Sequence, residues 1–379
     1  MRKAPDRELN IAMFGHKRIP SREGGIEIVV AELSTRMAAL GHQVTCYNRT
    51  GHHVSGSEYD ENKALSAYRG VKLKQAWTVD KRGLAAMTAS VSAAFSTALG
   101  KYDVVHIHAE GPAFMCWLPK LFGKKVIVTI HGLDWARAKW GKFASWYIKS
   151  GEKNAVKYAD QIIVLSTAVQ AYFRDAYGRE TVFIPNGVVK PEAKEADEIA
   201  KRWGLRKDDY VLFLGRLVPE KGIHYLIEAW KGVSTAKKLV IAGGSSDTGE
   251  YMNALKEQAG NGVIFTGFQQ GRILEELYSN AYVYVLPSNL EGMPLSLLEA
   301  MSYGNCCLVS SIPECAQVVE DHAAVFEKGN ADDLRDKLQR LIDCPDEVKR
   351  YKDNASAFIC GKYNWDDVVG RTLDLYRDC

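Results

Sequence analysis

The sequence predicts an α/β protein with two domains, each built around a doubly wound parallel sheet. The chain has 379 residues, which is too long for one ordinary core and suits two domains of roughly 180 residues. Short apolar runs alternate with longer amphipathic segments, which is typical of parallel strands joined by helices. The alternation begins again after the turn at residues 185–188, so the same architecture is expected twice.

The charge of the chain is unevenly distributed between its halves. Residues 1–190 hold 27 Lys and Arg against 16 Asp and Glu (+11), and residues 191–379 hold 22 against 30 (−8), which together give +3. The basic half predicts that the first domain meets an anionic partner. Nucleic acid is not favoured as that partner, because the chain has no zinc finger, no RNA-binding signature and no basic run with interleaved aromatics.

The composition also favours a cytoplasmic location. The N-terminus has no apolar signal region, and no apolar run is long enough to cross a bilayer. The eight cysteines show no paired Cys-x-x-Cys spacing, which favours free thiols in a reducing compartment.

The first domain opens with a βαβ pattern. A strand at 11–15 leads through Gly24 and Gly25 into a helix over 26–40, and a second strand follows at 43–47. Two glycine amides at a helix N-terminus are a candidate site for a diphosphate, and a simple tight turn is the alternative. The loop has no G-x-G-x-x-G, which counts against a nicotinamide or flavin enzyme. Further strands of this domain are expected at 71–77, 104–108, 126–130, 162–165 and 182–184.

Histidines follow the central strands of this domain. His106, His108 and Glu110 alternate along one strand, a pattern that could bind zinc, although no fourth ligand is evident. His131 comes directly after the next strand, at the carboxyl edge where ligands bind in open α/β folds.

A helix is predicted over 135–157, with lysine and tryptophan along one face. The steps between these residues are 4, 3, 4, 3, 4 and 4, which places them on one stripe. The stripe consists of Trp135, Lys139, Lys142, Trp146, Lys149, Lys153 and Lys157. Such a face is typical of an anionic membrane surface, and an ordinary solvated lysine face is the alternative.

The second domain begins with a strand at 210–214, followed by a glycine-bounded loop from Gly215 to Gly222. Arg216 and Lys221 place two cations in this loop, where they could bind a diphosphate. Further strands are expected at 238–242, 263–266, 281–286 and 306–310.

The segment 289–301 carries two carboxylates around a predicted helix N-terminus. Glu291 lies in the loop after a strand, Pro294 is expected at the first helical position, and Glu299 lies within the helix. Carboxylates accept hydrogen bonds from hydroxyls, and free helix amides bind an anion. A nucleotide sugar offers both kinds of group.

Two stretches of the second half carry a family resemblance. They are Glu291-Gly292-Met293-Pro294-Leu295-Ser296-Leu297-Leu298-Glu299-Ala300-Met301 and Gly215-Arg216-Leu217-Val218-Pro219-Glu220-Lys221-Gly222. Together they resemble the retaining glycosyltransferases of family 4. The resemblance covers nearly the whole chain and implies the GT-B fold, two Rossmann-like doubly wound domains facing each other across a cleft. It implies an acceptor-binding domain over 1–188, a nucleotide-sugar-binding domain over 189–361, and a helix within 362–379 that crosses back onto the first domain.

The resemblance also implies roles for individual residues. Arg216 and Lys221 stabilise the leaving diphosphate, Glu291 contacts hydroxyls of the donor sugar, Glu299 holds the ribose, and His131 approaches the sugar near C6. Gly24, Gly25, Gly215, Gly292 and Leu295 complete the expected donor contacts. The acceptor attacks the face from which the diphosphate departs, without a covalent enzyme intermediate. No cofactor and no metal are expected, and the chain contains no Asp-x-Asp.

The expected function is therefore transfer of a sugar from a nucleoside diphosphate to a lipid-linked or polysaccharide acceptor in cell-surface glycan synthesis. Location at the inner face of the cell membrane would suit such an acceptor.

A UDP-hexose is the expected donor. The stretch from Lys17 to Glu27 loosely resembles bacterial rhamnosyltransferases, so dTDP-rhamnose is a second candidate. Family members often have Glu-x-Phe-Gly where this chain has Glu291-Gly292-Met293-Pro294, and Pro294 offers no N–H to the donor. A GT-B sugar-nucleotide epimerase and a non-catalytic sugar-nucleotide binding protein are the alternatives.

Overall fold

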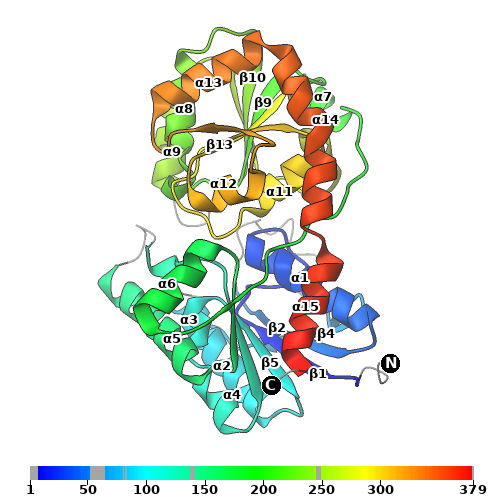
Figure 1. Cartoon of the computed structure of the whole chain (residues 1–379), viewed down its shortest axis with the longest axis vertical. Coiled ribbons are helices and arrows are strands. Elements are labelled where there is room, and N and C mark those ends of the chain that lie inside the picture. The colour runs from blue at the N-terminus through cyan, green and yellow to red at the C-terminus, as the bar shows by residue number, and fades with distance from the viewer. Residues whose placement is uncertain are drawn as a thin grey trace. The chain divides into compact units, whose positions relative to one another are not determined.

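The computed structural model describes residues 7–51, 65–79, 81, 83–136, 141–244 and 249–377. The chain divides into two compact units, one formed by residues 1–186 with 365–379 and the other by residues 187–364. Figure 1 shows the elements of both units. Within the described residues, every helix is too short or too polar to span a membrane.

The first unit is an eight-stranded sheet in the order β3-β4-β2-β1-β5-β6-β7-β8. All neighbouring strands are parallel except β3 and β4. The strands are β1 (Asn10–Phe14), β2 (Gln43–Arg49), β3 (Ala67–Tyr68), β4 (Val71–Ala76), β5 (Val104–His108), β6 (Lys125–Ile130), β7 (Gln161–Val164) and β8 (Val182–Phe183). The helices are α1 (Gly25–Ala39), α2 (Ala85–Leu99), α3 (Glu110–Ala113), α4 (Trp117–Leu121), α5 (Lys142–Tyr158), α6 (Thr167–Tyr177) and α15 (Trp365–Arg377), with a 3₁₀ turn at Asp134–Ala136.

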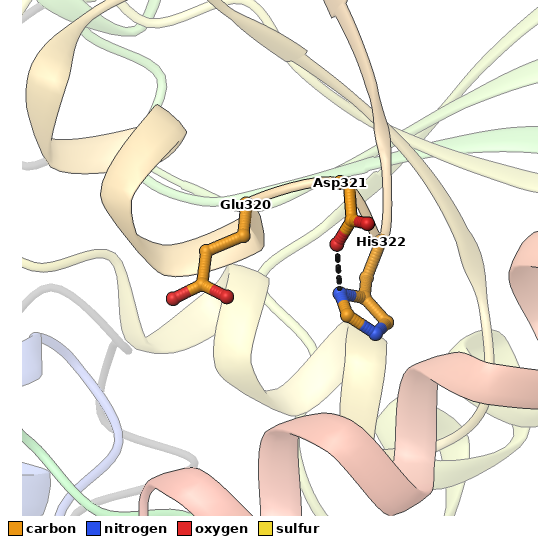
Figure 2. Close-up of side chains that lie close together, drawn as sticks. All are labelled: Glu320, Asp321 and His322. Carbon is orange, nitrogen blue, oxygen red and sulfur yellow. Dashed lines mark ion pairs between the residues drawn. The ribbon is translucent and has the colours of Figure 1, made fainter.

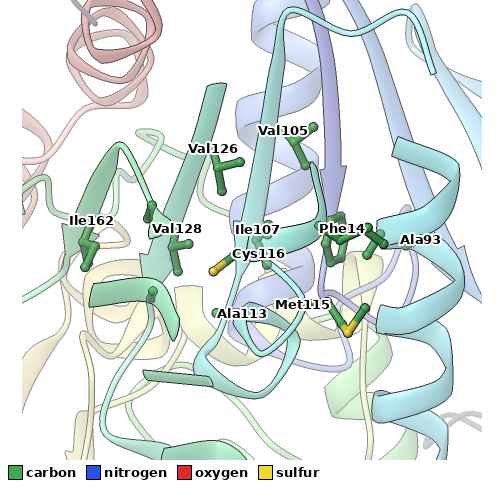
Figure 3. Packing of buried hydrophobic residues seen from close by; sticks show 14 of the residues in the cluster. Phe14, Ala93, Val105, Ile107, Ala113, Met115, Cys116, Val126, Val128 and Ile162 are labelled. Carbon is green, nitrogen blue, oxygen red and sulfur yellow. The ribbon is translucent and has the colours of Figure 1, made fainter. Parts of the chain in front are cut away.

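One hydrophobic core of this unit lies between the sheet and helices α2 to α6. It joins aliphatic residues of the central strands to small residues of α2 and α3, and Figure 3 shows Phe14, Ile107 and Val128 packed with Ala93 and Cys116. Helix α15, from the end of the chain, packs beside α1. Its Tyr376 hydroxyl is 2.6 Å from His106 Nδ1, so the C-terminal helix completes a buried polar contact of the sheet.

The second unit is a six-stranded parallel sheet in the order β11-β10-β9-β12-β13-β14. Its strands are β9 (Tyr210–Leu214), β10 (Lys238–Ala242), β11 (Val263–Gly267), β12 (Val283–Leu286), β13 (Cys306–Ser310) and β14 (Ala324–Phe326). Its helices are α7 (Glu198–Trp203), α8 (Ile223–Lys231), α9 (Gly249–Gln258), α10 (Gly271–Ser279), α11 (Leu295–Ser302), α12 (Pro313–Val319), α13 (Ala331–Asp343) and α14 (Pro345–Lys362), with a 3₁₀ turn at Pro219–Lys221.

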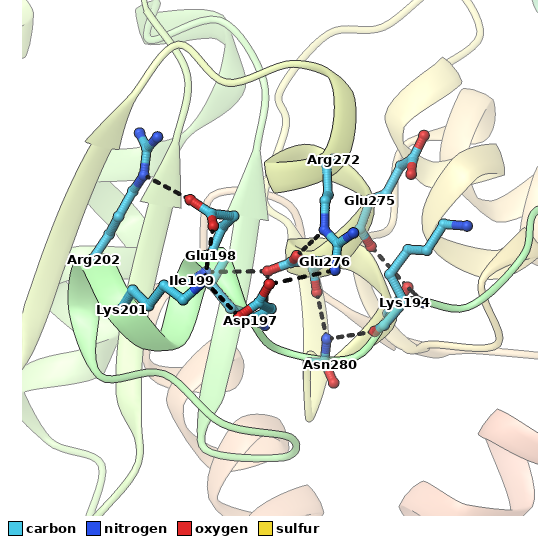
Figure 4. Close-up of polar contacts among 11 residues, drawn as sticks. Lys194, Asp197, Glu198, Ile199, Lys201, Arg202, Arg272, Glu275, Glu276 and Asn280 are labelled. Carbon is cyan, nitrogen blue, oxygen red and sulfur yellow. Dashed lines mark hydrogen bonds and ion pairs between the residues drawn. The ribbon is translucent and has the colours of Figure 1, made fainter.

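The segment before α7 and the first turn of α7 are anchored to α10 by polar contacts around the buried Glu276 (Figure 4). Glu276 accepts hydrogen bonds from the backbone N–H groups of Asp197 and Ile199, and it forms an ion pair with Arg272. Asn280 donates to the carbonyl of Lys194. The charged stretch at 190–198 is therefore held against α10 of the second unit.

The largest difference from the predicted elements lies in the first unit. The helix predicted over 135–157 is wrong in its first part, because Trp135 belongs to the 3₁₀ turn at Asp134–Ala136 and α5 begins at Lys142. Residues 137–140 lie outside the described residues, and Lys139 of the predicted stripe is among them.

Candidate active site

The basic loop after β9 and the acidic loop after β12 meet in the second unit, because Gly222 allows their backbones to approach closely. Gly222 has φ +66, and a Cβ there would lie 2.0 Å from the carbonyl oxygen of Pro287. The N–H of Asn289 donates to the carbonyl of Glu220 over 2.8 Å. The loop after β9 is therefore packed against the loop that leads from β12 into α11, and a side chain at Gly222 would separate the two.

Lys221 and Glu291 form a short ion pair at this contact. Lys221 Nζ lies 2.5 Å from Glu291 Oε1, which also accepts from Ser288 Oγ over 2.6 Å. Only 14% of the lysine side chain and 8% of the glutamate side chain are exposed. The Lys221 side chain also lies close to Gly215, since a Cβ on Gly215 would be 4.0 Å from Lys221 Cε. Arg216 is half-buried in the same loop. The structure thus joins a cation predicted for the diphosphate to the acid predicted for the sugar.

Helix α11 presents an N-terminus without an acidic residue in its first turn. The helix begins at Leu295, and its N-cap Pro294 has φ −75 and ψ 102. The prediction that Pro294 is the first helical residue is therefore wrong by one position. No side chain caps this end, so its backbone N–H groups suit an anion. Gly292 lies in the loop just before it.

Glu299 lies in the second turn of α11 and is half-buried. The Tyr278 hydroxyl donates to its Oε2 over 3.2 Å, and the Tyr278 ring stacks on Tyr303 with centroids 5.3 Å apart. Tyr278 therefore holds the carboxylate, and Tyr303 supports the Tyr278 ring.

In the first unit, the candidate diphosphate site at Gly24 and Gly25 has a carboxylate of its own. Gly24 is the N-cap of α1 and Gly25 its first residue. Glu27 Oε1 accepts from the N–H of Lys17, and a Cβ on Gly24 would lie 2.5 Å from Glu27 Oε2. A diphosphate at this helix start would have to share the space with Glu27, which is not among the predicted site residues.

Four histidines of the first unit lie on or just after its strands, and three of them, His16, His106 and His108, are fully buried while His131 is half-buried. His108 Nδ1 is 3.1 Å from His131 Nε2, and His16 Nε2 is 3.0 Å from the side-chain oxygen of Asn48. Burial lowers the pKa of His16 and of His131 to about 4, and that of His106 to about 3. Burial also holds the pKa of His108 well below its usual value. These rings are therefore neutral at pH 7 and act as hydrogen-bonding groups.

The zinc alternative for the strand of His106 does not fit the geometry. His106 uses both ring nitrogens, one toward Tyr376 and one toward Thr129 at 2.7 Å. Glu110 is not on the strand and is instead the first residue of α3.

Within the part of the chain that the structure describes, the one cluster of potential metal ligands is Glu320, Asp321 and His322 (Figure 2). Lys362 already forms an ion pair with Glu320, and the His322 ring stacks on Phe358. These contacts explain the cluster as an ordinary feature of the surface of the second unit.

The chain resembles known glycosyltransferases along most of its length. A family model described as Glycosyltransferase Family 4 matches residues 23–189, and one described as Glycosyl transferases group 1 matches residues 195–358. An uncharacterised glycosyltransferase of Methanocaldococcus jannaschii is 26% identical, over 97% of this chain and 98% of the relative. UDP-Gal:alpha-D-GlcNAc-diphosphoundecaprenol alpha-1,3-galactosyltransferase of Escherichia coli is 29% identical, over 73% of this chain and 76% of the relative.

Solved structures share the fold. Sucrose-phosphate synthase from Thermosynechococcus elongatus has a TM-score of 0.82 and 22% identity, and the match covers 98% of both chains. The Anabaena protein HepE, in complex with UDP-glucose, has a TM-score of 0.79 and 16% identity, over 97% of this chain and 100% of that chain. The two doubly wound units therefore have the GT-B fold. The two family models show that the chain is a glycosyltransferase. The chain belongs to the family 4 type, with a Family 4 domain followed by a group 1 domain.

Proposed function

We propose that the protein is a retaining, metal-independent glycosyltransferase that moves a hexose from a UDP-sugar to a lipid-linked or polysaccharide acceptor of the cell surface. The observation that carries the proposal is the Lys221–Glu291 pair beside the uncapped N-terminus of α11. The Escherichia coli relative is named for a UDP-Gal donor and a diphosphoundecaprenol acceptor, and HepE binds UDP-glucose. Both names favour a UDP-sugar over the dTDP-rhamnose alternative.

The proposed chemistry follows from the charges of the second unit. Breaking the anomeric bond builds negative charge on the leaving diphosphate, and preorganised cations and helix amides stabilise that charge. Lys221 and Arg216 supply the cations, and the first turn of α11 from Leu295 supplies the amides. Glu291 accepts hydrogen bonds from the sugar hydroxyls and Glu299 from the ribose. The acceptor attacks from the side on which the diphosphate leaves, and a phosphate oxygen takes its proton, so the anomeric configuration is kept.

A coupled assay for nucleoside diphosphate release tests this function. We expect UDP to appear only when a UDP-hexose and an acceptor are both present, and NMR of the product should show the anomeric configuration of the donor. The rate should stay the same in EDTA, because protein cations replace the divalent ion. An inverted product excludes the retaining mechanism, and activity that EDTA abolishes and Mn²⁺ restores excludes the metal-free one. Binding of donors without any transfer to a broad acceptor panel would favour a non-catalytic binding protein.

We further propose that helix α5 docks on an anionic membrane, with a smaller contact set than the sequence stripe. Phe143 and Trp146 are 67% and 59% exposed, and their ring centroids lie 5.9 Å apart. Lys153 and Lys157 are exposed further along the helix, at steps that keep them near the same face. Exposed aromatics beside lysines suit a bilayer interface.

Two members of the predicted stripe do not belong to this surface. The Trp135 indole donates to Glu152, and Lys149 forms an ion pair with Glu152 while its Nζ lies 4.0 Å from the centroid of the Trp135 ring. Both side chains are therefore committed to contacts within the first unit.

A further inference from the structure

Two buried carboxyl groups of the first unit lie in contact outside the predicted set of site residues. Glu110 is the first residue of α3 and Glu152 lies in the middle of α5, and both are fully buried. The two carboxyl groups lie close enough for each to shift the pKa of the other. Two buried acids in contact cannot both be ionised without a large cost, so their arrangement requires an explanation.

The backbone near the two acids is strained at one residue and closely packed at another. Ala109, which joins β5 to Glu110, has φ 80 and ψ 157, a conformation that L residues rarely adopt. Gly151 precedes Glu152, and a Cβ there would lie 2.0 Å from the carbonyl oxygen of Glu110. Helix α5 therefore approaches α3 closely only because residue 151 has no side chain. Strain and close approach at one point are typical of a functional position.

The hydrogen bonds show which acid carries the charge. Glu152 Oε1 accepts from the hydroxyls of Tyr172 and Tyr177 and from Lys149, and its Oε2 accepts from the Trp135 indole over 3.0 Å. Burial raises the pKa of Glu152, but hydrogen bonds with Tyr177, Glu110, Lys149 and Tyr172 outweigh it, so the pKa lies below its ordinary value.

Glu110 is the protonated partner. Its Oε2 accepts from the N–H of Asp134 over 2.8 Å, while its Oε1 receives no hydrogen bond from any described donor. Burial, Asp134 and Glu152 raise the pKa of Glu110 to about 10. Oε1 is therefore suited to carry the proton that Glu110 shares with Glu152.

Both acids hold the same short loop. Glu110 binds the backbone of Asp134, and Glu152 binds the side chain of Trp135. The loop starts with His131, which contacts His108 at the end of β5. The His131 ring is thus positioned by His108 on one side and by the two acids that hold Asp134 and Trp135 on the other.

We propose that the Glu110–Glu152 pair is a positioning device that fixes the His131–Trp135 loop for the transferred sugar, with Glu110 as a neutral donor and Glu152 as the charged acceptor. The inference rests on the proposed function, because it assigns the loop to the sugar site. It predicts that the same substitution has opposite consequences at the two acids. An amide at position 110 can donate to Glu152 and accept from Asp134, as the neutral acid does. An amide at position 152 loses the charge that four donors require.

The test compares Glu110→Gln with Glu152→Gln. We expect Glu110→Gln to keep kcat within about twofold of the wild type, and Glu152→Gln to lower kcat by about 10- to 100-fold, as for a catalytic group displaced by about 1 Å. UDP affinity should be unchanged in both, because its proposed contacts lie mainly in the second unit. A purely structural role would lower the amount of folded enzyme without changing kcat per folded molecule. Equal losses of kcat in the two variants would overturn the proposal.

If Glu152→Gln folds poorly, the variant Trp135→Phe and the NMR signals of His131 still test the proposal. Trp135→Phe keeps the ring under Lys149 but removes the bond to Glu152, and it should also lower kcat. Imidazole ¹⁵N NMR signals of His131, assigned with His131→Asn, should shift in Trp135→Phe and in Glu152→Gln but remain in place in Glu110→Gln. Unchanged His131 signals in folded Trp135→Phe would contradict the proposal. These signals do not depend on turnover, so they decide the positioning role even if the wild type transfers no sugar.

Discussion

At the scale of single residues, the strongest prediction concerns Lys221. Its ammonium group is held by Glu291 and Ser288 is bound to the same oxygen, so the cation is fixed before any ligand arrives. Fixed charge costs no reorganisation in the transition state. Loss of one charged hydrogen bond removes about 1.5 to 3 kcal/mol, so Lys221→Ala should lower kcat/KM by roughly one to two decades.

Steady-state kinetics of folded Lys221→Ala check this expectation. Lys231→Ala is a matched control, because Lys231 is an exposed lysine at the end of α8 in the same unit. Thermal unfolding should accompany the kinetics, since the substitution leaves Glu291 buried with one partner fewer. Wild-type kcat/KM in folded Lys221→Ala would remove the residue from the proposed mechanism.

The buried histidines predict how the stability of the first unit depends on pH. Their pKa values in the folded state, about 4 for His16 and His131 and about 3 for His106, lie below the ordinary value of 6.5. The unfolded chain therefore binds more protons below pH 6.5, and stability should fall as pH decreases toward 4. Each histidine contributes up to about 1.4 kcal/mol per pH unit.

Glu110 should act in the opposite direction. Its pKa is raised from 4.5 to about 10, so the stability that its proton provides is lost as pH rises through this interval. The two effects together place the maximum stability of the first unit at about pH 6.5. Urea unfolding followed by hydrogen exchange in peptides of β5 and β6 measures this curve. Glu110→Gln should remove the fall between pH 6.5 and 9 and leave the acidic one, and a flat curve between pH 7 and 4.5 would contradict the histidine pKa values.

At the scale of elements, α5 shows what a sequence pattern can and cannot reveal. The lysine and tryptophan spacing correctly places a helix over most of the segment, because that spacing depends only on local periodicity. The pattern could not show that Trp135 leaves the helix, because its partner Glu152 is seventeen positions away and reads as a surface acid among lysines. Glu110 was included only as a zinc ligand for the same reason, since its real partner lies on α5. Gly151 before Glu152 was the one local signal of a close approach.

The exposed face of α5 gives a prediction for this element. Replacing Phe143 and Trp146 together by Ser should strongly reduce binding to anionic liposomes, because the aromatic side chains would no longer enter the interface. Reversing Lys153 and Lys157 to Glu should have a similar effect at low salt, since juxtamembrane cations contribute about 1 kcal/mol each. Sedimentation with liposomes measures both. Lys149 is left unchanged because its ion pair with Glu152 is part of the packing of the first unit.

The control for the liposome experiment is a second exposed apolar pair in the same unit. Phe95 and Leu99 of α2 are 53% and 73% exposed, so Phe95→Ser with Leu99→Ser removes comparable apolar surface elsewhere. The control should bind liposomes like the wild type. Equal binding by the Phe143 and Trp146 variant and the wild type would leave α5 as an ordinary solvent-facing helix.

At the scale of the whole molecule, the doubled architecture could be predicted because it depends on alternation along the sequence. Each predicted strand of the second unit overlaps an observed one, and the loop glycines mark where strands end. The pairing of Lys221 with Glu291, seventy positions apart, could not be derived in this way, since it depends on the close approach of Gly222 to Pro287. Likewise, periodicity predicts a final helix but does not show that its Tyr376 reaches His106.

The division of the chain leads to a last prediction. Residues 187–364 form one continuous unit that contains Arg216, Lys221, Glu291 and Glu299. This segment alone should fold and bind UDP, because the proposed ribose and diphosphate contacts lie within it. Calorimetry should give a UDP affinity within about tenfold of that of the full chain, the expected loss for one missing hydrogen bond at Gly24 or Gly25. The same segment with Glu299→Ala is the control and should bind UDP more weakly. If the folded segment has no measurable affinity for UDP while the full chain binds it, the first unit supplies more of the nucleotide site than the residues proposed here. In that case Gly24, Gly25 and the neighbouring Glu27 would be the first positions to vary.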